Sequence, residues 1–302
     1  MAKILITGGT GLVGRAISKR LMNEGYDVVV LSREAGETKG IKKYKWDVKS
    51  GYIDLNAFEG VEAVIHLAGS GIVDKSWTEA YKKEIRDSRV KSSELIFKTI
   101  QKNKIPIKTF IGGSAIGYYG SGMSDHVFKE EDEAGADFMG RVCVQWENSY
   151  KPFTEAGIRT CIIRTGIVLS KHGGAYPKML LAFKWGLGSP FGSGKQYFPW
   201  IHLNDLAGIF IYALQHETLH GTFNAVGPEI LTNKDFSQKL AKSLNRPYFM
   251  PAVPLFMLKM ILGERVVTIS TGLKISNKKI KEAGFVFEFE DVDAALKDLA
   301  RS

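Results

Sequence analysis

The stretch KILITGGTGLVG, residues 3–14, sets the fold of the N-terminal half of this chain. It begins with the apolar run Ile4-Leu5-Ile6, typical of a buried strand, and apolar residues then recur at 13, 16, 17 and 21 with helical spacing. A glycine-rich turn between a strand and a helix lets the backbone approach a pyrophosphate, and the helix amides then face the phosphates. The stretch therefore predicts a dinucleotide site made by Thr7, Gly8, Gly9, Thr10, Gly11, Leu12, Val13 and Gly14.

The end of the next apolar run, residues 28–31, indicates which dinucleotide is bound. An acidic residue at this point would take the ribose hydroxyls of NAD and repel the 2′-phosphate of NADP. This chain has Ser32-Arg33 instead, and arginine is a permanently charged, planar donor that suits a phosphate. The sequence therefore predicts NADP(H) as the cofactor, held by Ser32 and Arg33. A solvated loop arginine is the alternative.

Short β-branched runs alternate with helical periodicity along the chain, which predicts βαβ units and a parallel sheet. We expect strands near 44–46, 63–67, 109–111, 160–164 and 222–226, helices over 92–101 and 142–156, and a helix capped by Asp205 that runs to Ala213. The expected fold class is α/β, a Rossmann-type doubly wound parallel sheet with a smaller C-terminal substrate lobe. We assign to the core residues 1–168 with 199–228 returning, and to the lobe residues 169–302, with loop-rich 170–198 and C-terminal 229–302.

Several further residues are candidates for the cofactor site. Asp47 follows a strand-like segment and either accepts the adenine amino group or closes a turn. Leu67, Ala68 and Gly69 end the next strand with a small, flexible segment, which lets backbone approach the cofactor's second ribose and diphosphate. Arg89, on an expected helix, either pairs with a phosphate or forms a surface ion pair.

Composition argues against several other classes of function. The net charge is +9, from 41 Lys and Arg against 32 Asp and Glu, but the basic residues are dispersed rather than clustered on one face. Cys143 and Cys161 are too few for a disulfide framework and have no metal-ligand spacing. Gly192-Ser193-Gly194-Lys195 lacks the first glycine and the final Ser or Thr of a P-loop. We therefore expect no nucleic-acid partner, no bound metal and a small-molecule substrate.

Two segments of the sequence bear on the location of the protein in the cell. Residues 1–7 run directly into a strand and leave no room for a signal peptide. The apolar stretch 158–169 is far shorter than a membrane span and carries Arg159 and Arg164. These features predict a cytoplasmic location and no membrane partner.

Motifs along nearly the whole chain resemble those of one family. They are GGTGLVG at 8–14, LSR at 31–33, HLAG at 66–69, SAIGYYG at 114–120, CVQWE at 143–147, RTGIVLS at 164–170, GLGSPFGSGKQYFPWIHLNDLAG at 186–208 and GF-x-F at 284–287. In these motifs the chain resembles the extended short-chain dehydrogenase/reductases of the NAD-dependent epimerase/dehydratase superfamily. More narrowly, it is similar to the atypical, epimerase-like branch of YfcH-like NADP-dependent oxidoreductases. The resemblance implies a Rossmann core with a C-terminal substrate lobe and supplies no substrate. Homodimers are common in the superfamily, so a homodimer is left open.

The resemblance also locates the reaction centre. Typical members use a tyrosine and a lysine in the pattern Tyr-x-x-x-Lys, and the matching positions here are Met139 and Cys143. Methionine has no proton to transfer and cysteine lacks the charge of lysine, so the usual pair is absent. Ser114, which matches the position of the family's serine, is the first catalytic candidate, because its hydroxyl can hydrogen-bond a carbonyl.

Four more residues are candidates around this centre. Tyr118 and Tyr119 follow in the glycine-rich turn and are catalytic candidates, with aromatic packing as the alternative. His202 has a suitable pKa range for acid–base chemistry, with a structural role beside the Asp205 helix as the alternative. Arg164, at the end of a core strand, would anchor an anionic group of cofactor or substrate, or pair with an acidic side chain.

These observations leave three hypotheses of function. The first is an NADP(H)-dependent oxidoreductase or epimerase-like enzyme acting on a small molecule. The second is a non-catalytic NADP(H)-sensing regulatory protein, which the missing Tyr-x-x-x-Lys pair favours. The third, sugar-nucleotide epimerisation with tightly held NAD, is weakened by Arg33.

Overall fold

The computed structural model describes residues 2–270 and 272–300, and its centre is a nine-stranded sheet. Eight strands follow one another in the order β12-β9-β7-β6-β1-β2-β4-β3, and β5 pairs with β4. The pairings of β3 and β5 with β4 are antiparallel and the others are parallel. The strands are β1 (Lys3–Thr7), β2 (Asp27–Ser32), β3 (Gly36–Thr38), β4 (Ile41–Asp47), β5 (Tyr52–Ile53), β6 (Val61–His66), β7 (Thr109–Ala115), β9 (Arg159–Thr165) and β12 (Gly221–Ala225).

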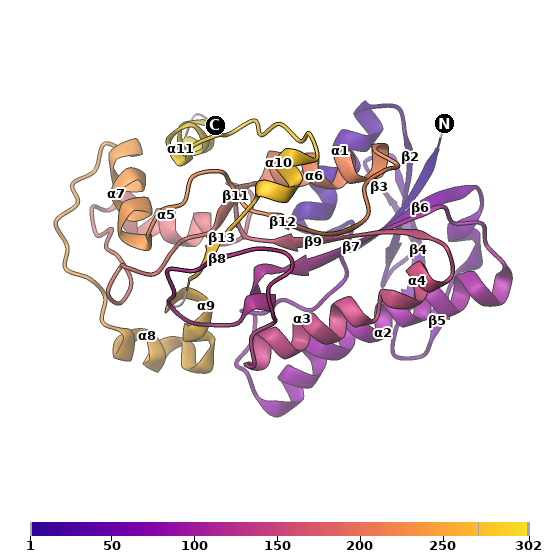
Figure 1. Cartoon of the computed structure of the whole chain (residues 1–302), viewed down its shortest axis with the longest axis horizontal. Coiled ribbons are helices and arrows are strands. Elements are labelled where there is room, and N and C mark those ends of the chain that lie inside the picture. Colours follow the sequence, from indigo (N-terminus) through magenta and orange to yellow (C-terminus); the bar gives the residue numbers. More distant parts are fainter. Residues whose placement is uncertain (1, 271, 301–302) are drawn as a thin grey trace.

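Helices cover both faces of this sheet (Figure 1). One face carries α1 (Leu12–Asn23) and α6 (Leu203–Gln215), and the other carries α2 (Glu79–Asn103), α3 (Phe138–Asn148) and α4 (Lys151–Glu155). Side chains of β1 alternate between the faces: Ile4 and Ile6 pack with Ile17 of α1, whereas Leu5 packs with Ile96 of α2. Both faces are therefore buried, which explains the unbroken apolar runs in the sequence. The predicted α/β, Rossmann-type, mostly parallel fold is confirmed.

The order of the strands reverses between β1 and β6. From β1 the chain builds outward through β2 and β4, and from β6 it builds the other way through β7, β9 and β12. Open α/β sheets bind ligands at such a switch point, beyond the carboxyl ends of the strands. Here the switch point lies between the turn after Thr7 and the segment after His66.

The C-terminal elements form a second apolar cluster near the carboxyl ends of the strands (Figure 1). The cluster is built around large buried side chains, including Tyr176, Trp200, Phe236 and Leu296. Two small parallel pairs, β10 (Ile167–Leu169) with β11 (Trp200–His202) and β8 (Val127–Phe128) with β13 (Lys274–Ile275), join these segments to the rest. The remaining helices are α5 (Tyr176–Lys184), α7 (Asn233–Ser243), α8 (Leu255–Leu262), α9 (Val267–Ser270), α10 (Lys278–Glu282) and α11 (Val292–Ala300), and the short 3₁₀ helices are η1 (Leu55–Phe58), η2 (Ile116–Tyr119) and η3 (Gly263–Val266).

Three expectations about helices need correction. The helix expected to begin near Ser92 begins at Glu79, because Tyr81 and Ile85 add a buried face to an otherwise polar stretch. The helix expected over 142–156 is two helices, α3 and α4. His202, and not Asp205, is the N-cap of α6: its side chain accepts a hydrogen bond from the amide of Asn204. In the part of the chain that is described, no helix is both long and apolar enough to cross a membrane.

Candidate functional site

The glycine turn between β1 and α1 is a close-packed cradle. A Cβ on Gly8 would lie 2.8 Å from the carbonyl oxygen of Leu67, and one on Gly9 would lie 2.5 Å from Cγ2 of Val30. A Cβ on Gly14 would collide with the backbone of Gly8 and Gly9. Gly11 is the N-cap of α1 and no side chain caps the helix, so its first amides stay free to bind an anion. The space and the donors suit a pyrophosphate.

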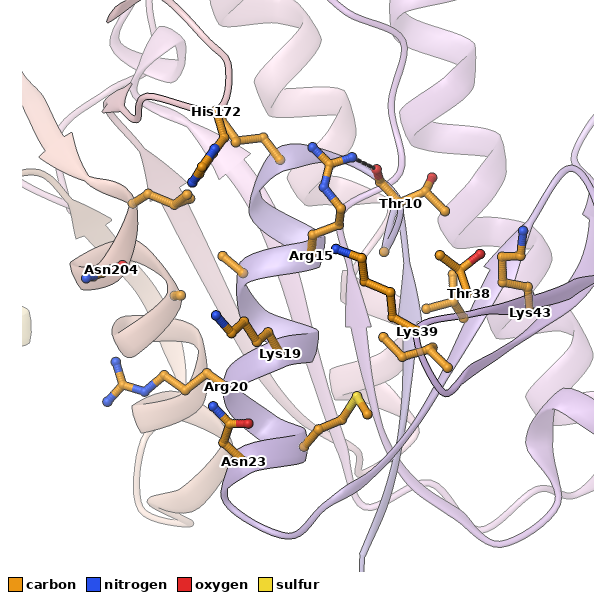
Figure 2. A pocket seen from close by; sticks show the side chains of 18 of the residues that line it. Thr10, Arg15, Lys19, Arg20, Asn23, Thr38, Lys39, Lys43, His172 and Asn204 are labelled. Carbon is orange, nitrogen blue, oxygen red and sulfur yellow. Dashed lines mark hydrogen bonds between the residues drawn. The ribbon is translucent and has the colours of Figure 1, made fainter. Parts of the chain in front are cut away.

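The surface beside this turn is rich in cations, and in the described structure Arg20 is the one of them that forms an ion pair, with Glu24 at 3.1 Å. Between β2 and β4 the chain forms only the β3–β4 hairpin and no helix, so one face of β4 stays open beside α1. A cavity of about 970 Å³ lies there along α1 (Figure 2). Glu288 is the one acidic residue among those that line it, against the basic residues Arg15, Lys19, Arg20, Lys39 and Lys43. An anion would meet positive charge with almost no competition.

Two of these cations, Arg15 and Lys39, lie close to the glycine turn. The guanidinium of Arg15 donates to the carbonyl oxygen of Thr10 at 2.5 Å. Figure 2 shows Lys39 extending from the β3–β4 turn toward α1, and Lys39 has a positive φ of 52°. Arg33, on the loop after β2, is exposed and lies outside the lining of the cavity. Sequence reasoning found Arg33 and missed the other two, although Arg15 directly follows the third glycine.

A buried polar chain holds the segment 67–69 against the turn. The hydroxyl of Thr7 accepts the amides of Leu67 and Ala68, both at 3.1 Å, and donates to Nδ1 of His66 at 2.8 Å. Nε2 of His66 then donates to Ser92 at 3.1 Å. Burial lowers the pKa of His66 to about 3, so the ring is neutral at physiological pH. Thr7 therefore positions the backbone of Leu67 and Ala68 beside the turn.

The two remaining candidates near the turn have clear structural roles. Asp47 is exposed and accepts the amide of Lys49 at 2.9 Å, so it closes a turn, and hydrogen bonds from Ser50 and Lys49 lower its pKa. Arg89 is 7% exposed and forms no ion pair with any residue that the structure describes, so the expected surface ion pair is wrong. Its guanidinium donates to the carbonyl oxygens of Ser70 and Ile85 and packs against Gly69 and the ring of Trp146. The direct roles of Asp47 and Arg89 toward a cofactor stay predictions.

Met139 and Cys143 lie where the sequence places the missing pair. Both are on α3 and face η2, because a Cβ on Gly117 would lie 3.5 Å from Cβ of Met139 and 3.8 Å from Sγ of Cys143. Burial raises the pKa of the Cys143 thiol to about 12, which keeps it protonated. Neither side chain can exchange a proton with a ligand at neutral pH.

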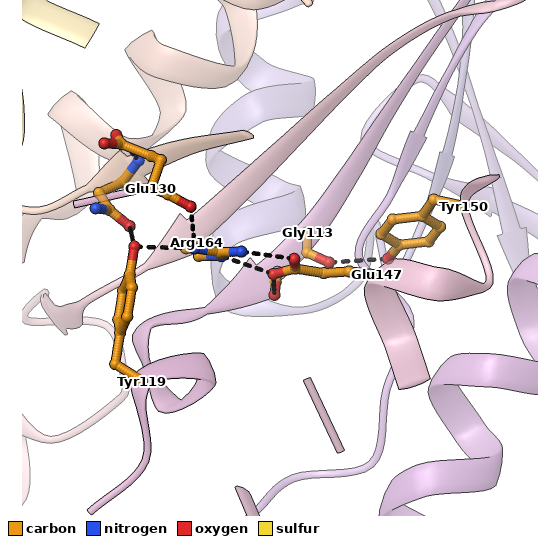
Figure 3. Close-up of polar contacts among 8 residues, drawn as sticks. Gly113, Tyr119, Glu130, Glu147, Tyr150 and Arg164 are labelled. Atoms are coloured by element: carbon orange, nitrogen blue, oxygen red, sulfur yellow. Dashed lines mark hydrogen bonds and ion pairs between the residues drawn. The ribbon is translucent and has the colours of Figure 1, made fainter. Parts of the chain in front are cut away.

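A buried ion pair occupies the space beside these positions (Figure 3). Arg164 donates to both carboxylate oxygens of Glu147, from Nε at 2.8 Å and from Nη2 at 2.9 Å. Ser114 donates to the same carboxylate at 2.7 Å. Of the two roles expected for Arg164, the structure shows the pairing with an acidic side chain. Its third nitrogen is also used, because Nη1 donates to Tyr119 and to the carbonyl oxygen of Glu130.

The two tyrosines of η2 differ in their surroundings. Tyr119 is buried: its hydroxyl accepts from Arg164 at 2.9 Å and donates to Asn224 at 2.8 Å, and burial raises its pKa to about 12. Tyr118 is partly exposed, and its ring stacks on the guanidinium of Arg164 at 3.3 Å from the ring centroid. Tyr118 is thus the tyrosine of the two that a ligand can reach.

His202 lies away from this network, in the core of the C-terminal elements. It is 3% exposed, its ring packs on Phe289 at 4.0 Å, and Nε2 lies 3.4 Å from the carboxylate of Asp298. Burial lowers its pKa to about 4. Together with its capping of α6, these contacts give His202 the structural role that was the alternative.

Comparisons with known proteins agree with this architecture. Residues 4–226 match the model of the NAD dependent epimerase/dehydratase family, and residues 253–299 match a domain of unknown function, DUF1731. The mouse epimerase family protein SDR39U1 is 33% identical over 300 residues, which cover 98% of this chain and 99% of the relative. YfhF of Bacillus subtilis is 33% identical over 298 residues, with 98% and 97% covered.

A solved structure is similar over the full length. The crystal structure of human epimerase family protein SDR39U1, isoform 2, with NADPH has a TM-score of 0.88 and is 32% identical, with 99% of each chain covered. The family match spans well over half of the chain, and its range includes the glycine turn, the strands of the main sheet and the Ser114 network described above. This chain therefore belongs to the NAD dependent epimerase/dehydratase family.

Proposed function

We propose that this chain binds NADP(H) at the glycine turn and uses it as an oxidoreductase or epimerase-like enzyme on a small molecule. The observation that carries the proposal is the set of unpaired cations beside the turn, with no acidic residue at the end of β2. Arg33 and Arg15 would hold the 2′-phosphate, and the free amides of α1 would hold the pyrophosphate. The human relative crystallised with NADPH supports the same choice of cofactor.

The nicotinamide supplies hydride chemistry when the cofactor is bound, and the protein has to supply orientation and a proton. Tyr118 is the first candidate for contact with a substrate carbonyl, because it is partly exposed. Ser114 is the second: it is 4% exposed, and its hydroxyl would have to turn away from Glu147. Tyr119 and His202 are engaged in buried contacts. Met139 makes the region around Ser114 and Tyr118 more apolar than the usual tyrosine would. The expected substrate is accordingly a carbonyl or hydroxyl compound with an apolar part.

The test of the cofactor is a pair of titrations with NADPH and NADH on purified protein. Wild type should bind NADPH clearly more tightly. Arg33→Ala should weaken NADPH about tenfold or more, since hydrogen bonds to charged groups are worth roughly 1.5–3 kcal/mol, and should leave NADH nearly unchanged. Lys98→Ala, an exposed residue on α2 at the opposite face, is the matched control and should change neither affinity. Equal affinity of wild type for both cofactors would contradict the proposal.

The test of activity is a screen of carbonyl compounds followed by loss of NADPH absorbance. Turnover of any compound that Tyr118→Phe or Ser114→Ala reduces would support the enzymatic proposal. The second candidate function, a non-catalytic NADP(H) sensor, is favoured by Met139 and Cys143 at the positions of the usual pair. A protein that binds NADPH tightly, turns over nothing, and recruits a partner only when NADPH is bound would establish the sensor instead.

A further inference from the structure

The C-terminal elements carry a concentrated apolar surface that the proposed function does not use. Of the 17 large hydrophobic side chains that are exposed in the described chain, nine lie in the two segments 181–187 and 249–261. We call these nine residues the apolar patch. They are Leu181, Trp185, Leu187, Phe249, Leu255, Phe256, Met257, Met260 and Ile261.

The two segments lie side by side. The backbone of Gly192 donates to Val253 and that of Val253 donates to Pro190, so the loop after α5 runs along the start of α8. A Cβ on Gly186 would lie 3.6 Å from Pro247, which brings the end of α5 to the chain just before Phe249. The two segments that carry the patch therefore meet where the loop after α5 contacts the chain before α8.

The helix α8 projects from the rest of the molecule (Figure 1). Its sequence is LFMLKMIL, and none of its residues is buried. Phe256 is 67% exposed, Met260 83% and Ile261 75%. Solvent-exposed surface of this kind marks an interaction site, because monomeric proteins seldom leave large contiguous apolar patches in water. Side chains that are this exposed are better suited to insertion into the headgroup region of a bilayer than to contact with a flat protein surface.

The two chain stretches that carry the patch have charged side chains of one sign only. There is no Asp or Glu from residue 156 to 204 or from 236 to 263. The exposed cations Lys178, Lys184, Arg246 and Lys259 lie within these stretches, and none of the four forms an ion pair in the described structure. The first acidic residue after α8 is Glu264, which pairs with Lys82 at 2.8 Å.

We propose that the apolar patch attaches this protein to the surface of an anionic lipid bilayer. Apolar side chains would enter the boundary between headgroups and acyl chains, and the surrounding lysines and arginine would meet the anionic headgroups, the arrangement typical of interfacial helices. Trp185 suits that boundary, because its ring is apolar and its N–H is polar. A second copy of this chain is a poorer occupant, because the exposed cations Lys178, Lys184, Arg246 and Lys259 of the two copies would face each other. The sequence expectation of no membrane partner rested on the lack of a spanning segment, and surface attachment needs none.

The test is sedimentation of the full-length protein with vesicles of phosphatidylcholine alone, or of equal parts phosphatidylcholine and phosphatidylserine. Binding is expected with the second kind only, and it should weaken between about 0.1 M and about 1 M salt as the Debye length falls from ~10 Å to ~3 Å. The double variant Phe256→Ser/Met260→Ser should bind roughly tenfold or more weakly. Val286→Ser, which removes an apolar side chain that is 82% exposed outside the patch, is the matched control and should bind as wild type does.

Tryptophan fluorescence gives a second measurement on the same samples. Trp46, Trp77, Trp146 and Trp200 are buried and Trp185 is 76% exposed, so an emission shift on adding vesicles reports on Trp185. A blue shift is expected with anionic vesicles, and Trp185→Phe should abolish it.

Three results would overturn the proposal. The first is no binding of wild type to anionic vesicles at low salt, including the case in which it binds soluble polyglutamate and thus favours acidic protein. The second is equal vesicle binding by the patch variant. The third is a dimer, measured by light scattering, that the patch variant converts to a monomer. Circular dichroism and NADPH titration of each variant would show that the fold is kept.

Discussion

The two parts of the candidate site, the glycine turn and the network around Ser114, differ in how their charges are balanced. Beside the glycine turn, Arg15, Lys39 and Arg33 have no acidic partner in the described structure. Beside Ser114, the one guanidinium, that of Arg164, is held by both oxygens of Glu147 and has its third nitrogen bound as well. An unpaired cation can bind an anion directly, whereas a paired one must first lose its partner. The structure thus provides anion binding at one end and a rigid frame at the other.

The same network lies beside the two positions at which the sequence resemblance places the pattern Tyr-x-x-x-Lys. Met139 and Cys143 fill the positions of the missing pair, and the ion pair of Glu147 with Arg164 lies beside them. That pair links α3 to β9, and through Tyr119 and Asn224 it reaches β12. A buried, charged network therefore holds these elements together around Ser114.

Breaking the frame should have the largest effect. Glu147→Ala leaves Arg164 as a buried charge without a partner, since the two side chains are only 11% and 4% exposed. Loss of one partner of a buried ion pair costs roughly 3–5 kcal/mol, so the free energy of unfolding by urea should fall by about that amount. Glu62→Ala, which removes an exposed partner of Lys108, is the matched control and should cost less than ~1 kcal/mol.

The same variant tests whether the glycine turn and the network around Ser114 act independently. If the comparison is right, Glu147→Ala lowers stability but leaves the affinity for NADPH within about twofold in the protein that remains folded, as expected for sites that share no partners. A large loss of NADPH affinity at unchanged stability would mean that Arg164 binds the cofactor after all.

The same contrast explains what the sequence could predict. The glycine turn lies within 12 consecutive residues, residues 3–14, and its strand, turn and helix all carry local signals. The core strands at 3–7, 27–32, 61–66, 109–115, 159–165 and 221–225 were predictable for the same reason, since each is an apolar run between turns. An element can be predicted from local sequence when the pattern of its own residues shows that it is buried.

The frame could not be predicted because its members are distant in sequence. Glu147 and Arg164 belong to different elements, and Asn224 is 105 residues from Tyr119, so only the folded sheet brings them together. The cap of α6 failed differently: Asp205 is a common capping residue type, but the helix begins two residues earlier at Leu203 and His202 supplies the acceptor. The unpaired Lys39 was missed because it depends on the hairpin that replaces a helix between β2 and β4.

The buried ring of His66, beside the glycine turn, should make the free energy of unfolding depend on pH. His66 has its pKa lowered by burial to about 3, against an ordinary value of 6.5, so the unfolded chain binds a proton at pH 5 and the folded chain does not. Stability is complete above pH 6.5 and falls as the pH drops toward 3, by about 2 kcal/mol between pH 7 and pH 5 from this group. Urea unfolding at these two pH values should show the loss, and His66→Gln should remove most of it. An exposed histidine change, His172→Gln, should leave the pH dependence as it is.

Weakening the open end should have a smaller effect. Arg15→Ala removes one of the unpaired cations, and the affinity for NADPH should fall about tenfold, while the affinity for NADH changes less than threefold, because only the 2′-phosphate differs. Lys39→Ala should act in the same direction and more weakly, since an exposed lysine is a flexible point charge. Identical effects on NADPH and NADH would place these residues at the pyrophosphate instead.

The smallest change tests whether the two tyrosines of η2 do different work. Tyr119→Phe removes the hydroxyl between Arg164 and Asn224 and should cost about 1 kcal/mol of unfolding free energy, the usual net value of a buried hydrogen bond. Tyr118→Phe keeps the ring that stacks on Arg164 and loses only a hydroxyl with no partner in the described structure, so its stability should stay within ~0.5 kcal/mol of wild type. The same two variants should show the reverse order in turnover, because Tyr118 is the one that a ligand can reach. If Tyr119→Phe instead lost turnover at full stability, the frame would itself take part in the reaction, and the division between binding end and rigid end would fail.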